Sequence, residues 1–82
     1  MPSGYRKPTT ADLREALPEA RDLLMDEIEY RWASEENAGR VADALQAARS
    51  AEALGYPHHV EMHLVRALAI FREDHAAGGG RV

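Results

Sequence analysis

Cysteine is absent from this chain of 82 residues. Disulfides, thiolate nucleophiles, cysteine-ligated zinc sites and iron–sulfur clusters are therefore excluded. The absence also fits a reducing compartment. A chain this short buries only about 60–65% of the surface that its unfolded form exposes, so its own core is thin. Stability in such chains often comes in part from a metal or a partner subunit.

Long apolar runs and basic patches are missing too. No segment approaches the roughly 18–20 apolar residues that span a bilayer, and the start MPSGYRKP is followed by no apolar stretch of a signal peptide. We therefore predict a cytoplasmic protein without membrane contact. Ten basic residues stand against fourteen acids, for a net charge of −4. Nucleic acid is not an expected partner, because phosphate neutralisation supplies most of the affinity for it.

Signals for strands and for catalysis are also scarce. The chain shows neither strict polar–apolar alternation nor an Asn-Gly or Asp-Gly hairpin turn, so we predict an all-α fold. Its serines lack the surroundings of a nucleophile elbow, and no glycine-rich phosphate loop precedes a helix. The Glu-x-x-His pattern of di-iron carboxylate bundles is missing as well. We predict a protein that is not an enzyme and has no catalytic or cofactor-binding residues.

Proline, glycine and capping residues predict a small helical bundle. After a short N-terminal helix, three main helices are expected over about 18–35, 38–54 and 57–76. Gly55 ends the second of these as a left-handed C-terminal residue. The connection that follows is so short that the last two helices should pack as an antiparallel hairpin.

The boundaries leave one alternative open. The apolar stripe stays in phase across Asn37, so a single helix over 18–54 competes with two helices. We favour a break near residues 37–39, because asparagine caps helices and glycine weakens them. Around one helical domain, 10–77, we expect a flexible arm over residues 1–9 and a flexible Gly-rich tail over 78–82.

The last helix looks more apolar than a lone short chain can cover. At about 100° per residue its apolar side chains lie on more than one side, so more than one surface has to cover it. We predict that a second copy of the chain covers this helix in a homo-oligomer, a dimer or higher. A different protein is the other possible partner. The residues expected at the interface are Val60, Leu64, Val65, Leu68, Ile70 and Phe71.

The same stretch carries all four histidines of the chain. His59 and His63 are four residues apart, so on a helix their rings project from one face at a spacing that can hold a transition metal. Two ligands do not complete such a site, and carboxylates from a neighbouring helix or subunit would have to join them. The sequence therefore predicts either no cofactor or a divalent transition metal at these two histidines.

Two functions follow from these patterns. The first is a non-catalytic interaction or regulatory module that self-associates through an apolar helix face. The second is a metal-binding helical protein that uses His59 and His63. A DNA-associated regulator is a third hypothesis, but it would need a basic face that these charges do not provide.

Overall fold

A computed structural model describes residues 7–25 and 29–81 of the chain. The flexible arm predicted for residues 1–9 therefore lies mostly outside the described residues. Helix α1, Thr10–Ala16, begins at a reciprocal cap: the Thr9 hydroxyl accepts a hydrogen bond from the Asp12 N–H (3.1 Å), and the Asp12 carboxylate accepts one from the Thr9 N–H (2.9 Å). These bonds satisfy backbone donors that the first turn of a helix leaves without partners.

Helix α2, Pro18–Leu23, is much shorter than the helix predicted over 18–35. It ends at Leu23, with Leu24 as its C-terminal cap, and the chain is extended at strand β1, Tyr30–Arg31. The prediction is therefore wrong beyond the first part of that range. Tertiary contacts explain the difference, because Tyr30 packs on Phe71 with ring centroids 4.9 Å apart. Such packing overrides a modest helix propensity.

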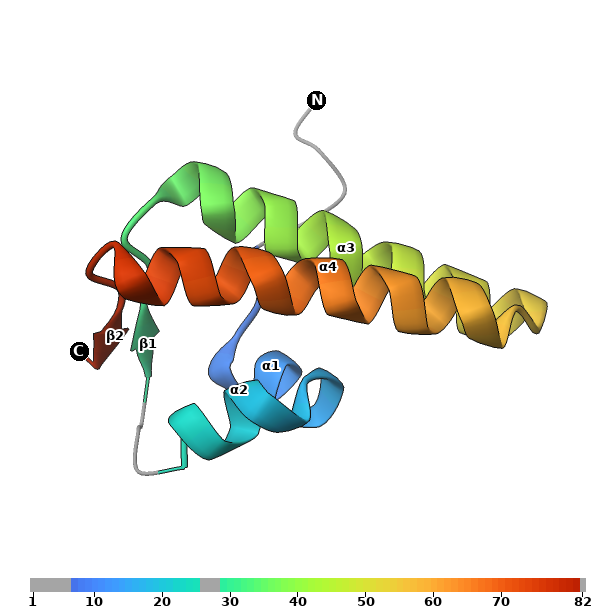
Figure 1. The fold of residues 1–82 in the computed structure, drawn as a ribbon, viewed down its shortest axis with the longest axis horizontal. Helices are drawn as coiled ribbons and strands as arrows, with labels where there is room; N and C mark the ends of the chain where they lie inside the picture. Colours follow the sequence, from blue (N-terminus) through green and yellow to red (C-terminus); the bar gives the residue numbers. More distant parts are fainter. Residues whose placement is uncertain (1–6, 26–28, 82) are drawn as a thin grey trace.

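Two long helices form the body of the molecule. Helix α3, Glu35–Leu54, begins after Ser34, whose hydroxyl accepts a hydrogen bond from the Asn37 N–H (3.2 Å). Its start is three residues earlier than predicted, and the extended backbone before it excludes a single helix over 18–54. Gly55 ends α3 with a φ of 81°, in the left-handed region. Helix α4, Pro57–Ala76, has the predicted bounds and returns beside α3 in the opposite direction (Figure 1).

The end of the chain returns to the start of α3. Strand β2, Gly80–Arg81, pairs with β1 in antiparallel register, Tyr30 with Arg81 and Arg31 with Gly80. This pairing differs from the flexible tail predicted for residues 78–82. Gly79, just before β2, is buried, and a Cβ there would collide with the Asp74 carboxylate and the Tyr30 hydroxyl. Glycine is therefore needed where the backbone approaches these groups so closely.

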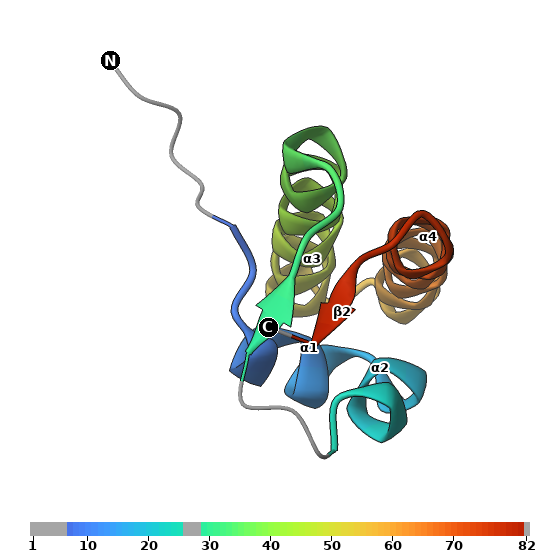
Figure 2. The same ribbon diagram turned by 90° about the vertical axis from the view of Figure 1, so that its left-hand side faces the viewer.

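The elements form two layers. Figure 2 shows α3 and α4 side by side, with α1 and α2 on one side of the pair and β1–β2 at its end. In Figure 1, α1 and α2 lie along the part of the hairpin near the strands, and the end with the α3–α4 turn extends beyond them. The predicted all-α class is confirmed, with the short β1–β2 pair as an addition. The buried core consists of Leu13, Leu17, Ala20, Leu24, Val41, Ala44, Leu45, Ala67, Ile70 and Phe71.

The core lies between the two layers, at the end of the hairpin that α1 and α2 cover. Polar links hold the layers together there, with a Glu19–Arg72 ion pair between α2 and α4 and an Asp12–Arg49 pair (3.5 Å) between α1 and α3. Within the described part of the chain, no helix combines the length and the apolar character that a membrane crossing requires.

Candidate functional site

A buried carboxylate organises the end of the molecule where β1, α3 and α4 meet. Asp74, in the last turn of α4, is fully buried. Its Oδ2 atom accepts hydrogen bonds from the Tyr30 hydroxyl (2.7 Å) and the Ala33 N–H (3.0 Å). Its Oδ1 atom accepts from the Ser34 N–H (3.0 Å) and the Asn37 side-chain amide (3.2 Å). Four donors from one short segment thus surround a single carboxylate.

These contacts decide the protonation of Asp74 and Tyr30. Burial on its own would raise the pKa of Asp74, but the hydrogen bonds from Ala33, Tyr30, Asn37 and Ser34 outweigh it and hold that pKa below the ordinary value of 3.8. Burial, then the hydrogen bond to Asp74 and its negative charge, raises the pKa of Tyr30 well above that of a free tyrosine. At neutral pH the pair is therefore a carboxylate that accepts from a phenol.

Three aromatic rings pack beside this carboxylate. Tyr30 lies edge-on to Trp32 at 4.9 Å between ring centroids, and Trp32 lies edge-on to Phe71 at 6.1 Å. Such geometry adds about 0.5–1.5 kcal/mol per pair to the area that the rings bury. Tyr30 and Trp32 are partly buried, and both pack against the core.

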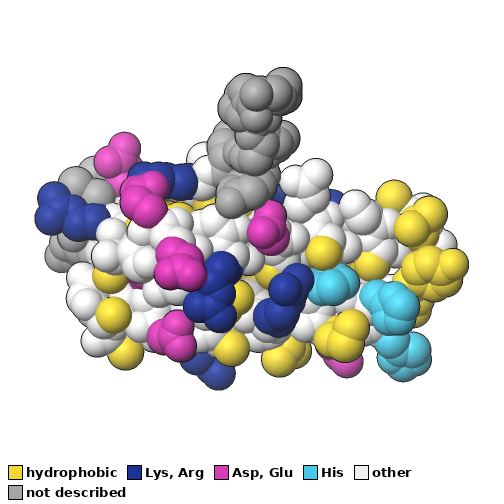
Figure 3. All heavy atoms as spheres, turned by 90° about the horizontal axis from the view of Figure 1, so that it is seen from above, with side chains coloured by type: hydrophobic (Ala, Val, Ile, Leu, Met, Phe, Trp, Pro, Cys, Tyr) yellow, Lys and Arg dark blue, Asp and Glu magenta, His cyan; other side chains and the backbone are white. Residues whose placement is uncertain are grey.

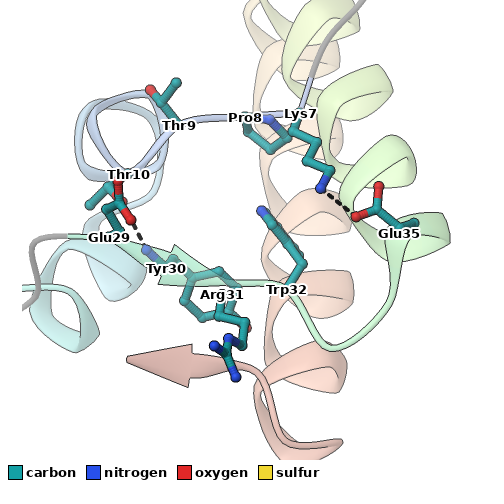
Figure 4. A pocket seen from close by; sticks show the side chains of 9 residues that line it. All are labelled: Lys7, Pro8, Thr9, Thr10, Glu29, Tyr30, Arg31, Trp32 and Glu35. Atoms are coloured by element: carbon teal, nitrogen blue, oxygen red, sulfur yellow. Dashed lines mark hydrogen bonds and ion pairs between the residues drawn. The ribbon is translucent and has the colours of Figure 1, made fainter. Parts of the chain in front are cut away.

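A shallow hollow of about 470 Å³ lies next to the rings, between the segment that precedes α1 and the start of α3. Figure 4 shows Lys7 paired with Glu35 beside Trp32, while Arg31 extends away from this ion pair. The Thr10 hydroxyl in the wall of the hollow already accepts from the Tyr30 N–H (3.1 Å). The Lys7–Glu35 pair and the Thr10–Tyr30 bond thus tie together the segments that line the hollow.

The opposite end of the hairpin has a different character. We call residues 53–65 the hairpin tip. Among the described residues, six large hydrophobic side chains are exposed, and four of them lie in this tip. They are Leu54 (69% exposed), Tyr56 (54%), Met62 (58%) and Val65 (62%). Figure 3 shows hydrophobic and histidine side chains gathered at this end, with acidic and basic side chains over the rest of the face.

The predicted interface residues divide between the two ends of α4. Ile70 (6% exposed) and Phe71 (0%) are in the core of the single chain, and half-buried Leu68 packs against that core. Leu64 is half-buried and also packs against the core, whereas Val60 is half-buried outside it and Val65 is exposed. Of the six residues predicted at the interface, only Val65 is thus exposed in the single chain, and it lies in the half of α4 near the tip.

The two predicted metal ligands also lie in the tip. His59 is exposed, with its ring 5.5 Å from that of Tyr56, and His63 is half-buried. The Nδ1 atom of His63 lies 3.2 Å from Nη2 of Arg66. No group of three or more histidine or carboxylate side chains in the described residues is arranged to hold a metal ion. Within residues 7–25 and 29–81, one copy of the chain therefore presents a pair of histidines with no third ligand grouped beside them.

Sequence reasoning missed Asp74, although a signal for it exists. Asp74 follows Ala67, Ile70 and Phe71 by seven, four and three residues, which places it in the middle of the buried stripe of α4. A lone acid at such a position needs hydrogen-bond donors from elsewhere in the fold. The donors themselves are backbone N–H groups of residues 33–34 and two side chains, which no periodicity identifies.

Comparisons with known proteins find no relative of this chain. No family model, no curated protein and no solved structure gives a significant match to the chain.

Proposed function

We propose that this protein is a small non-catalytic interaction module that associates with a second copy of itself through the hairpin tip. The observation that carries the proposal is the concentration of exposed Leu54, Tyr56, Met62 and Val65 at the end of the hairpin that α1 and α2 leave uncovered. Large apolar side chains that are exposed together at one end of a small domain are typical of a protein–protein contact.

The distribution of charge favours a second copy as the partner. Glu61 is the one formally charged residue within residues 53–65, whereas the whole chain carries a net charge of −4. Two copies repel each other through this net charge, and the repulsion falls with distance and with screening. Contact between the two tips keeps the acidic bodies apart while it buries the apolar side chains of both. An approach through the other end would bring the charged bodies together.

Mass in solution tests the proposal. Light scattering and sedimentation of untagged protein should give about twice the chain mass of 9.1 kDa at high concentration, with dissociation on dilution. We expect Leu54→Glu and Met62→Glu to shift the protein to the monomer. Both side chains are exposed in the single chain, so a carboxylate at either position stays solvated and the fold survives.

Leu23→Glu is the matched control. Leu23 is also an exposed hydrophobic residue (43%), but it lies at the end of α2, outside the tip. Its replacement should leave the mass unchanged, and circular dichroism should show the same helix content for all variants. A protein that stays monomeric at millimolar concentration, or a dimer that persists in both tip variants, overturns the proposal.

A further inference from the structure

His59 and His63 form an accessible pair on a continuous helix. They are four positions apart in α4, so they lie about 6 Å apart along the helix axis and within about 40° of each other around it. Neither belongs to the buried face of α4, which consists of Ala67, Ile70, Phe71 and Asp74. Rings at this spacing can share one metal ion.

No other described residue of the same chain completes the site. The contacts of Arg40 with Glu73 (3.4 Å) and of Asn37 with Asp74 (3.2 Å) set the antiparallel register of α3 against α4. In that register, the two histidines lie level with the last turns of α3. The α3 positions there that share the side of Arg40 are Ala47, Ala51 and Leu54, none of which has a ligand atom in its side chain.

A second copy of the chain supplies what one copy lacks. We propose that two hairpin tips bind one divalent transition metal ion between them through His59 and His63 of each copy. This inference rests on the proposed self-association. Four imidazole nitrogens satisfy the tetrahedral coordination that Zn²⁺ takes, so the dimer needs no further ligand. Imidazole suits Zn²⁺, Cu²⁺ and Ni²⁺, whereas Mg²⁺ and Ca²⁺ require oxygen ligands.

Arg66 competes with the metal for His63. A guanidinium group only donates hydrogen bonds, so its contact with Nδ1 makes that atom the acceptor and leaves the proton of the neutral ring on Nε2. Neither nitrogen is then free to bind a metal. The contact is exposed, so it breaks at little cost when metal binds. Removal of Arg66 should therefore strengthen metal binding, which a merely structural role of His63 does not predict.

Titration of untagged, metal-free protein with Zn²⁺ tests this inference, with calorimetry for stoichiometry and sedimentation for mass. We expect one Zn²⁺ per two chains and a rise in the dimer fraction, with no effect of Mg²⁺. His59→Gln and His63→Gln should each weaken Zn²⁺ binding at least tenfold, and Arg66→Gln should tighten it about two- to fivefold. His58→Gln is the matched control, because His58 is exposed, adjacent to His59 and on another side of α4.

The outcomes separate the two proposals. A metal-free dimer whose mass and stability Zn²⁺ does not change overturns the metal site and leaves self-association standing. A metal-free monomer that Zn²⁺ converts to a dimer with this stoichiometry overturns association through apolar contact alone and supports the metal site. Binding of one Zn²⁺ per monomer, or binding that His63→Gln leaves intact, overturns the bridged site.

Discussion

At the scale of single residues, Asp74 connects segments that are far apart in the sequence. Its carboxylate accepts hydrogen bonds from β1, from the N-terminal cap of α3 and from the first turn of that helix. Its backbone carbonyl accepts from the Gly79 N–H (2.9 Å), which leads into β2. A negative charge at the C-terminal end of a helix is unfavourable by itself. The position is stable because four donors replace the water that burial removes.

Replacement of Asp74 by alanine should therefore be costly. It leaves buried donors of Tyr30, Ala33, Ser34 and Asn37 without their acceptor, and we expect a loss of about 3 kcal/mol in the free energy of unfolding. Urea denaturation followed by circular dichroism measures this loss. Asp43→Ala, at an exposed position of α3, should change stability by no more than about 0.5 kcal/mol. Equal effects of the two substitutions would contradict the role given to Asp74.

The same carboxylate should make the fold sensitive to acid. Its pKa in the folded protein lies below the ordinary value of 3.8, so its stabilising contribution is fully present above that value. The contribution is lost as the pH falls through the lower folded pKa. As the pH falls below about 4, the wild type should lose stability more steeply than Asp74→Asn, whose side chain does not titrate there. Parallel slopes in urea denaturation at a series of pH values would count against this prediction.

At the scale of elements, the sequence predicts those helix boundaries that a proline or a glycine fixes locally. The start of α4 follows from Pro57 at its first position, and the end of α3 follows from Gly55. The extent of α2 could not be predicted, because the apolar stripe over 18–35 is compatible with a helix. The helix does not continue to residue 35 because Tyr30 and Trp32 contact Phe71, some forty residues further along the chain. The pairing of β1 with β2 was unpredictable for the same reason.

The α3–α4 turn offers a test of backbone strain without steric complications. Gly55 has a φ of 81°, and a Cβ added there would meet no atom within 4 Å. Gly55→Ala should destabilise the fold by about 1–2 kcal/mol, since the left-handed region disfavours a Cβ. Gly55→Asn should cost less, because asparagine tolerates this conformation better. Thermal unfolding of both variants provides the comparison, and an equal loss in both would show that strain in φ is not the cause.

At the scale of the whole molecule, the fold is covered unevenly. One end of the hairpin has α1, α2 and the β1–β2 pair around it, and the tip has none of them (Figure 1). The sequence predicts a helix too apolar for a lone chain. In the structure, Ile70 and Phe71 of α4 are buried within the single chain, and Met62 and Val65 near the tip are exposed. Ile70 and Phe71 could not be assigned to the core from the sequence, because the place where α1 and α2 dock does not follow from periodicity.

The uneven charge predicts an unusual response to salt. If two chains of net charge −4 meet through nearly uncharged tips, salt screens the repulsion between their bodies and breaks no ion pair. Raising NaCl from about 20 mM to about 500 mM should strengthen self-association roughly two- to tenfold. Sedimentation equilibrium at both concentrations measures the change. Weaker association at high salt would indicate an interface held by opposite charges.

The sole tryptophan of the chain, Trp32, lies against Tyr30 and Phe71 at the end of the hairpin opposite the α3–α4 turn. Its fluorescence should change when that end unfolds, and so should report loss of the fold. It should change little when the hairpin tip associates with a second copy. A spectroscopic titration of assembly therefore needs a second reporter, and Tyr56→Trp would place one at the turn, beside His59.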